Sequence, residues 1–232
     1  WLVLAGVFGI LLFVRCEIKV DNPVLNINLF RNNRTFAFSN LAALIIYSAT
    51  FAISFLLSLY LQYVKSLSPQ NAGLILVTQP IVMTIFSPFA GRLSDRVEPG
   101  IITSAGMVLT VISLLLFTFL NKETTLEFVV ASLILLGFSL ALFSSPNTNA
   151  VMSSVERRFY GVSSATLGTM RLTGQMLSMG IAMLIFAIYI GKVQITPEHY
   201  SLFLTSMKTA FVIFAVLCYG GIFTSLARGK VR

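Results

Sequence analysis

The chain has 232 residues, of which 56% are hydrophobic and 10% are charged, and its formal net charge at pH 7 is +8. A soluble globular domain carries about 25% charged residues, so this composition excludes a water-soluble protein and indicates one that is solvated by lipid. The basic balance does not indicate nucleic-acid binding, because the charges fall in the predicted loops between apolar segments.

The first apolar stretch, Trp1–Val14, is shorter than the roughly 20 residues that a transmembrane helix needs. It lacks the basic start and the small-residue cleavage site of a signal peptide. We therefore interpret residues 1–14 as the end of a truncated linker span. Residues 15–36, which contain Asn-Pro and Asn-Asn, then form a cytoplasmic connection between bundles.

Six further apolar segments are long enough to cross a membrane. They are Leu41–Tyr63, Gly73–Ala90, Ile101–Leu120, Phe128–Val151, Ser163–Ile190 and Thr209–Leu226. The pattern predicts an all-α integral membrane protein with a six-span bundle over residues 37–226 and a cytoplasmic tail over residues 227–232.

The loop charges predict the orientation of this bundle. Eleven of the 16 basic residues lie in segments 15–36, 92–100, 152–160 and the C-terminal tail, whereas Lys65, Lys122, Lys192 and Lys208 lie on the other side. Because cytoplasmic loops are enriched in Lys and Arg, we expect a multi-pass protein of the cytoplasmic membrane with its C-terminus in the cytoplasm.

Arg171 is the one remaining basic residue, and it lies inside the fifth span. Small and polar residues precede and follow it at alternating steps of three and four, which places them on one helix face; they are Gly161, Ser164, Gly168, Gln175, Ser178 and Ala182. The opposite face, with Leu167 and Met170, can face lipid. An ionisable residue at this depth is a functional-site hypothesis, with a structural clamp as the alternative.

The fourth span offers a partner for Arg171. Pro146 leaves the carbonyl of Leu142 without its helical hydrogen bond, and Ser144 and Asn147 lie close by in the same polar patch. We predict that Arg171 donates to the Leu142 carbonyl and to this patch. In the first span, a stripe of Tyr47, Phe51, Ser54, Ser58 and Gln62 would suit an amphipathic ligand or a helix contact.

Three segments resemble the major facilitator superfamily. The pattern Gly91-x-Leu93-x-Asp95-Arg96 between the second and third spans resembles its loop signature, although Glu98-Pro99 replaces the usual Gly and basic residues. "GFSLALFSSPNTNAVMSSV" with "GVSSATLGTMRLTGQMLSMGIA" resembles the fourth and fifth spans of the C-terminal half of the fourteen-span drug:proton antiporters. "NLFRNNRTFAFSN" resembles the entry to that half.

The resemblance implies a secondary active transporter that exports amphipathic, often cationic, drug-like molecules in exchange for protons. It would work as a monomer whose two halves rock around a midplane site, with the third and sixth spans of each half at the periphery. The implied cavity residues are Tyr47, Phe51, Ser54, Gln79, Asn147, Arg171 and Gln175, and the implied gating residues are Gly91, Asp95, Arg96, Pro146 and Gly168.

The eight acidic residues all lie in predicted loops or at helix ends. A proton antiporter would therefore need its proton carriers in a missing N-terminal half, which the resemblance also implies. Two alternatives stay open: a transporter of an anionic metabolite or peptide with Arg171 as counter-ion, and a non-transporting membrane subunit that anchors or senses. No enzyme, metal site or cofactor is expected, because CxxC, HExxH and GxGxxG are absent.

Overall fold

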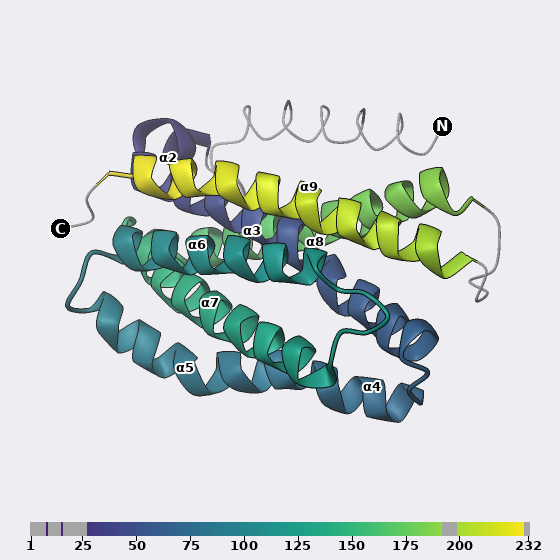
Figure 1. Ribbon diagram of the computed structural model, residues 1–232. Coiled ribbons are helices and arrows are strands. Elements are labelled where there is room, and N and C mark those ends of the chain that lie inside the picture. Colours follow the sequence, from purple (N-terminus) through teal and green to yellow (C-terminus); the bar gives the residue numbers. More distant parts are fainter. Residues whose placement is uncertain (1–7, 9–14, 16–26, 192–198, 230–232) are drawn as a thin grey trace.

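The computed structural model describes residues 8, 15, 27–191 and 199–229 (Figure 1). Within these residues every regular element is a helix, and six spans are long and apolar enough to cross a membrane. The predicted all-α, six-span membrane bundle is therefore confirmed. The stretch Trp1–Val14, which we interpret as the end of a linker span, lies outside the described residues except for Phe8.

The helical bounds extend the predicted spans. After the short helix α2 (Ile27–Asn32), the spans are α3 (Arg34–Leu59) with the π-helix η1 (Tyr60–Val64), α4 (Pro69–Leu76) with α5 (Thr78–Ser94), α6 (Pro99–Thr118), α7 (Leu126–Ser153), the 3₁₀ turn η2 (Arg157–Phe159) with α8 (Tyr160–Tyr189), and α9 (Tyr200–Ala227). The largest difference from prediction concerns α9, which begins before Thr209, so that Lys208 lies inside the helix rather than in a loop. A lysine can occupy such a position because its long side chain extends toward the membrane surface.

Prolines and caps explain several of these bounds. Asn33 caps α3 by accepting a hydrogen bond of 2.9 Å from the backbone N–H of Phe36. Pro99 is the first residue of α6, a position that suits proline because its missing N–H has no helical partner there. Pro80, the third residue of α5, cannot donate to the carbonyl of Leu76, and the second span divides at Val77 into α4 and α5. The helix continues through Pro88 in α5 and Pro146 in α7.

The ends of the six spans meet at two opposite ends of the bundle. At one end, Asn33 donates to the carbonyl of Ser154, Thr35 donates to the carbonyl of Arg228, and Asn149 donates to Ser94. We call this the basic end, because seven described arginines lie at or near the helix ends here: Arg31, Arg34, Arg92, Arg96, Arg157, Arg158 and Arg228. At the opposite end, Tyr60 donates to the carbonyl of Asn121 and Lys65 to that of Lys122.

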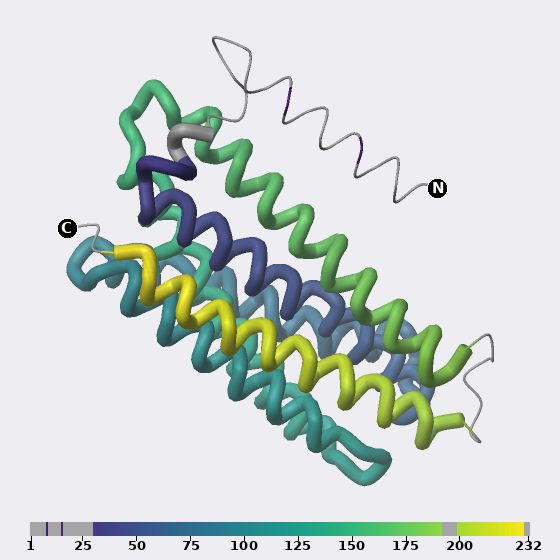
Figure 2. The backbone as a smooth tube through the Cα atoms, turned by 90° about the horizontal axis from the view of Figure 1, so that it is seen from above, coloured from purple at the N-terminus to yellow at the C-terminus, as the bar shows by residue number. Residues whose placement is uncertain are grey.

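The helices pair in a pattern that repeats between the first three spans and the last three. Span two (α5) packs on span four (α7), and span five (α8) packs on span one (α3); likewise α6 packs on α7, and α9 on α3. The contacts α6–α9 and α3–α7 join the two sets. Figure 2 shows α8, α3 and α9 side by side. Exchanging the two triplets therefore preserves the packing, as in a structural repeat.

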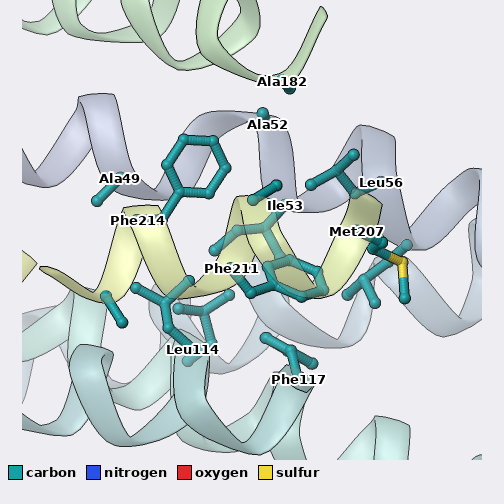
Figure 3. Close-up of a cluster of buried hydrophobic side chains, with 14 of the residues drawn as sticks. Ala49, Ala52, Ile53, Leu56, Leu114, Phe117, Ala182, Met207, Phe211 and Phe214 are labelled. Atoms are coloured by element: carbon teal, nitrogen blue, oxygen red, sulfur yellow. The ribbon is translucent and has the colours of Figure 1, made fainter. Parts of the chain in front are cut away.

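The buried core lies where α3, α6 and α9 meet (Figure 3). Phe211 and Phe214 of α9 are fully buried in this core, and on the other side of α3 the small side chain of Ala52 faces Ala182 of α8. Small residues are the expected interface in a membrane, because lipid is as apolar as a leucine side chain and only close packing favours helix association.

Two glycines let neighbouring helix backbones approach each other closely. A Cβ atom on Gly174 of α8 would lie 2.6 Å from the carbonyl oxygen of Leu44 in α3, and one on Gly137 of α7 would lie 2.5 Å from that of Gln79 in α5. These contacts dock α8 and α5 at the two edges of the bundle. Both helices expose most of their apolar surface, whereas α3 and α6 are largely buried.

Candidate functional site

A cavity of about 200 Å³ opens between α3, α7 and α8. Tyr47 and Ala43 line it from α3. The α7 wall consists of Phe143, Ser144, Asn147 and Thr148, and the α8 wall consists of Ser164, Leu167, Gly168 and Arg171. Arg171 is the twelfth residue of α8, about 16 Å along the helix axis from Tyr160. The cavity therefore lies deep within the span rather than at its end.

Arg171 is the charged member of this cavity, and it lies against an aromatic ring. Its guanidinium carbon is 5.3 Å from the centroid of the Tyr47 ring. A charge at this depth costs at least about 2.5–3.5 kcal/mol, and a cation–π contact returns about 0.5–2 kcal/mol. Tyr47 alone thus leaves part of the cost of Arg171 without compensation.

The predicted hydrogen bond from Arg171 to the Leu142 carbonyl is wrong in this structure. The carbonyl carbon of Leu142 lies against Gly106 of α6, 3.1 Å from where a Cβ atom on that glycine would be. This part of the α7 backbone therefore packs on α6, and within the described residues Arg171 donates no hydrogen bond to it. Ser144 and Asn147 line the same cavity as Arg171, but within the described residues Arg171 donates a hydrogen bond to neither, and the Asn147 amide pairs with Arg228 and with the carbonyl of Ser39 instead. Leu167, assigned by the sequence to the lipid face, also lines this cavity.

The structure brings together four of the predicted functional residues, namely Tyr47, Asn147, Gly168 and Arg171. The other predicted cavity residues lie elsewhere. Phe51 and Ser54 continue the Tyr47 face of α3 as exposed side chains, Gln175 is half-buried one turn beyond Arg171, and Gln79 lies near the start of α5.

The small-and-polar stripe of α8 divides into two parts. Near the middle of the helix, Ser178 and Ala182 are buried, and the hydroxyl of Ser178 accepts a hydrogen bond of 3.0 Å from the backbone N–H of Ala52 in α3. Nearer the basic end, Ser164, Gly168 and Arg171 face the cavity. One sequence pattern thus serves both helix packing and a polar wall.

The predicted gating loop closes the basic end between α5 and α6. A Cβ atom on Gly91 would lie 2.9 Å from the hydroxyl oxygen of Ser145, so the glycine lets α5 approach α7. Asp95 is the C-cap of α5, and both it and Arg96 are exposed. Pro146, the other predicted gating residue, is buried inside α7.

Arg228 is a functional candidate that the sequence did not single out, because it follows the last span in what reads as a tail. Its side chain is 1% exposed and is among the largest fully buried ones. It donates four hydrogen bonds, of 2.6–3.3 Å: to Thr103 of α6, to Asn147 of α7, and to the carbonyl and hydroxyl of Ser225 in α9. Burial lowers the pKa of Arg228 to about 10, opposed by the charge of Glu98, so the side chain stays cationic at neutral pH.

Asn147 connects this buried group to the cavity. Its amide oxygen accepts from Arg228, and its amide nitrogen donates to the carbonyl of Ser39 in α3 at 3.2 Å. We call Arg228, Asn147, Thr103, Ser104 and Ser225 the Arg228 cluster; the Ser104 hydroxyl joins it through Ser225 at 2.8 Å. The cluster joins α6, α7 and α9, and Asn147, which also lines the cavity, connects it to α3 through the carbonyl of Ser39.

Comparison with known proteins gives a consistent picture. The sequence profile described as "Major Facilitator Superfamily" matches residues 40–229. The riboflavin transporter RibZ of Clostridioides difficile is 28% identical over 220 residues, which are 94% of this chain and 48% of RibZ. The lincomycin resistance protein LmrB of Listeria innocua is 24% identical over 238 residues, covering 99% of this chain and 50% of LmrB.

A third relative, the multidrug resistance protein Stp of Mycobacterium tuberculosis, is 25% identical over 173 residues, which are 75% of this chain and 32% of Stp. The chain therefore spans about half the length, or less, of these curated relatives. All three names describe transport or drug resistance.

Proposed function

The chain belongs to the major facilitator superfamily, and from that premise we propose that it forms the C-terminal half of a proton-coupled exporter of amphipathic, drug-like molecules. Such a protein is a secondary active transporter and not an enzyme. The single observation that carries the proposal is the cavity of about 200 Å³ deep between α3, α7 and α8, with an aromatic ring, hydroxyls and one cation on its walls. A mixed apolar and polar lining is what an amphipathic ligand requires.

The exposed helices favour a second half. The edges α5 and α8 leave large apolar side chains uncovered, among them Phe89 and Met176. In the proposed transporter, an N-terminal half covers part of this surface and lipid covers the remainder. The protein works as a monomer, and the two halves rock around the cavity.

Proton coupling belongs to the other half in this proposal. Of the acidic residues that the structure describes, all lie in loops or near helix ends: Asp95, Glu98, Glu123, Glu127 and Glu156. A proton carrier has to titrate within the transport path, so the carboxylate that exchanges the proton is expected outside this chain segment.

The proposed location is the cytoplasmic membrane, with the basic end and the C-terminus in the cytoplasm. The positive-inside rule supports this orientation. Seven arginines of the described loops lie at the basic end, and Lys65 and Lys122 lie at the other.

A direct test uses the two compounds that the names of RibZ and LmrB mention. The whole gene product is expressed in cells that lack their own exporters, and accumulation of riboflavin and of lincomycin is measured against an empty vector. Export lowers accumulation of at least one. In everted vesicles, adding that compound should release protons from an imposed gradient, and nigericin should abolish uptake. Unchanged accumulation of both would overturn the proposed cargo, and a lack of coupling to the gradient would overturn antiport.

A further inference from the structure

The cavity between α3, α7 and α8 has an electrostatic bias. Arg171 is the charged residue among those that line it, and no carboxylate is present on its described walls. A second cation, Arg228, lies behind the α7 wall and donates to the amide oxygen of Asn147 at 3.3 Å. Arg171 makes the potential inside the cavity positive, and the low-dielectric surroundings screen it little; Arg228 adds to this potential, although the charge of Glu98 offsets part of its contribution.

The groups that could bind a cation are already engaged. Asn147 carries the one side-chain amide on the wall, and its oxygen accepts from Arg228. The face of the Tyr47 ring is covered by Arg171, whose guanidinium carbon lies 5.3 Å from the ring centroid. A cationic ligand would have to displace Arg171 from the ring and enter a positive field.

The groups that could bind an anion remain available. The guanidinium of Arg171 is exposed, and within the described residues it has the contact with Tyr47 but no salt bridge. Ser144 and Ser164 place hydroxyl groups on opposite walls of the same cavity. Arginine presents a planar fork of donors that matches a carboxylate, and such charge-assisted hydrogen bonds are the strong ones.

We infer that the cavity is a binding site for an anionic group carried on an apolar or aromatic body, with Arg171 as its counter-ion. The apolar walls formed by Ala43, Phe143 and Leu167 hold the body, and the anionic group lies against the guanidinium. The inference rests on the proposed function and specifies its cargo. It differs from the cationic cargo that the family resemblance implies.

The test compares three ligands of the same shape and different charge. Benzoate, benzamide and benzamidine carry charges of about −1, 0 and +1 at neutral pH on one benzene ring. Their equilibrium binding to the purified whole gene product in nanodiscs is measured by displacement of radiolabelled benzoate. We expect benzoate to bind about tenfold more tightly than benzamide, because a charge-assisted bond replaces a neutral one, and benzamidine to bind most weakly.

Variants then assign the preference to Arg171. Arg171→Gln should equalise benzoate and benzamide while benzamide still binds, which also shows that the cavity is folded. Arg171→Lys should keep the order with a smaller difference, because an ammonium group lacks the fork geometry. Lys208→Gln is the matched control: it removes one positive charge from α9, away from the cavity, and should leave all three affinities unchanged.

Equal binding of benzoate and benzamide to the unmodified protein would overturn the inference, and would point instead to a carboxylate elsewhere in the protein as the partner of Arg171. A benzoate preference that survives in Arg171→Gln would overturn it too. Because equilibrium binding needs no gradient, a protein that prefers benzoate but exports nothing would contradict only the proposed function. A protein that exports riboflavin without any charge preference would contradict only this inference.

Discussion

The helices at the basic end are joined by the side chain of Arg228. Its guanidinium donates four hydrogen bonds from three separate nitrogens to Thr103, Asn147 and Ser225, whereas a lysine ammonium group has only three donors, all on one nitrogen. We expect Arg228→Lys to lower the free energy of unfolding by about 2–3 kcal/mol, since at least one hydrogen bond to a charged group is lost. The measurement is thermal unfolding of the purified protein in detergent.

An exposed arginine provides the control for that substitution. Arg158 lies in the loop before α8 and pairs with Glu156 at 2.9 Å, with both side chains 70% exposed. Such pairs contribute at most about 1 kcal/mol, so Arg158→Lys should unfold like the unmodified protein. If Arg228→Lys and Arg158→Lys unfold at the same temperature, the Arg228 cluster does not stabilise the fold.

We expect the aromatic ring of Tyr47, rather than its hydroxyl group, to affect the KM for transport. Tyr47→Phe keeps a face for Arg171, whereas Tyr47→Leu removes it. Because the contact is worth about 0.5–2 kcal/mol, we expect Tyr47→Leu to raise the KM for transport about twofold to thirtyfold, and Tyr47→Phe to change it little. Initial rates in everted vesicles test this; equal effects of both substitutions would assign the role to the hydroxyl instead.

The two arginines also show what the sequence could and could not predict at this scale. Arg171 stands out because it interrupts an apolar span, and its neighbours at helical spacing correctly predict a polar face. Arg228 has no such signal, since a basic residue after a last span is ordinary. Its role depends on Thr103, Ser104 and Asn147, which are distant in sequence and meet only in the folded bundle. The one local hint in the sequence is Gly229, because a glycine directly after Arg228 is typical of a helix C-cap. In the structure Gly229 has a φ of 81°.

Among the helices, α8 offers a test of close packing with its own control. A valine at Gly174 would place its Cβ atom 2.6 Å from the Leu44 carbonyl of α3, whereas nothing lies within 4 Å of a Cβ atom on Gly180. Over-packing of this kind costs about 1–3 kcal/mol. We therefore expect Gly174→Val to lower the unfolding temperature in detergent and Gly180→Val to leave it nearly unchanged. Equal stability of the two variants would contradict the observed α3–α8 approach.

Long apolar runs made the six spans predictable, because a membrane leaves few ways to satisfy the backbone other than a helix. The first and last residues of the helices were harder to predict from the sequence, since helices continue beyond the hydrocarbon region into the membrane–water interface. The beginning of α9 shows this: Tyr200–Lys208 is helical although its serine, threonine and lysine weaken the apolar signal. The division at Val77 before Pro80 and the continuity at Pro146 also depend on packing, because both prolines give the same signal in sequence.

At the scale of the whole molecule, the paired arrangement of the triplets was beyond the sequence. The segments share no evident repeat, yet α5–α7 and α3–α8 make equivalent contacts. This arrangement leaves α5 and α8 at opposite edges and places the cavity between α3, α7 and α8. The position of the candidate site thus follows from helix pairing, and the stripe on α8 indicates only which face is polar.

The orientation of the whole bundle is the last testable consequence of the charge distribution. With Cys16 and Cys218 replaced by serine, Ser66→Cys places one thiol at the end opposite to the basic end, and Arg158→Cys places one at the basic end. If the basic end faces the cytoplasm, a membrane-impermeant maleimide should label the cysteine at position 66 in intact cells and the one at position 158 only after permeabilisation. The reverse pattern would invert the topology, whereas labelling of both in intact cells would mean that the chain adopts two orientations. The reverse pattern would also place Arg171, which lies nearer the Tyr160 end of α8 than the Tyr189 end, closer to the outer face than to the cytoplasm, so this labelling tests whether the charge at Arg171 lies on the side from which an exporter takes its cargo.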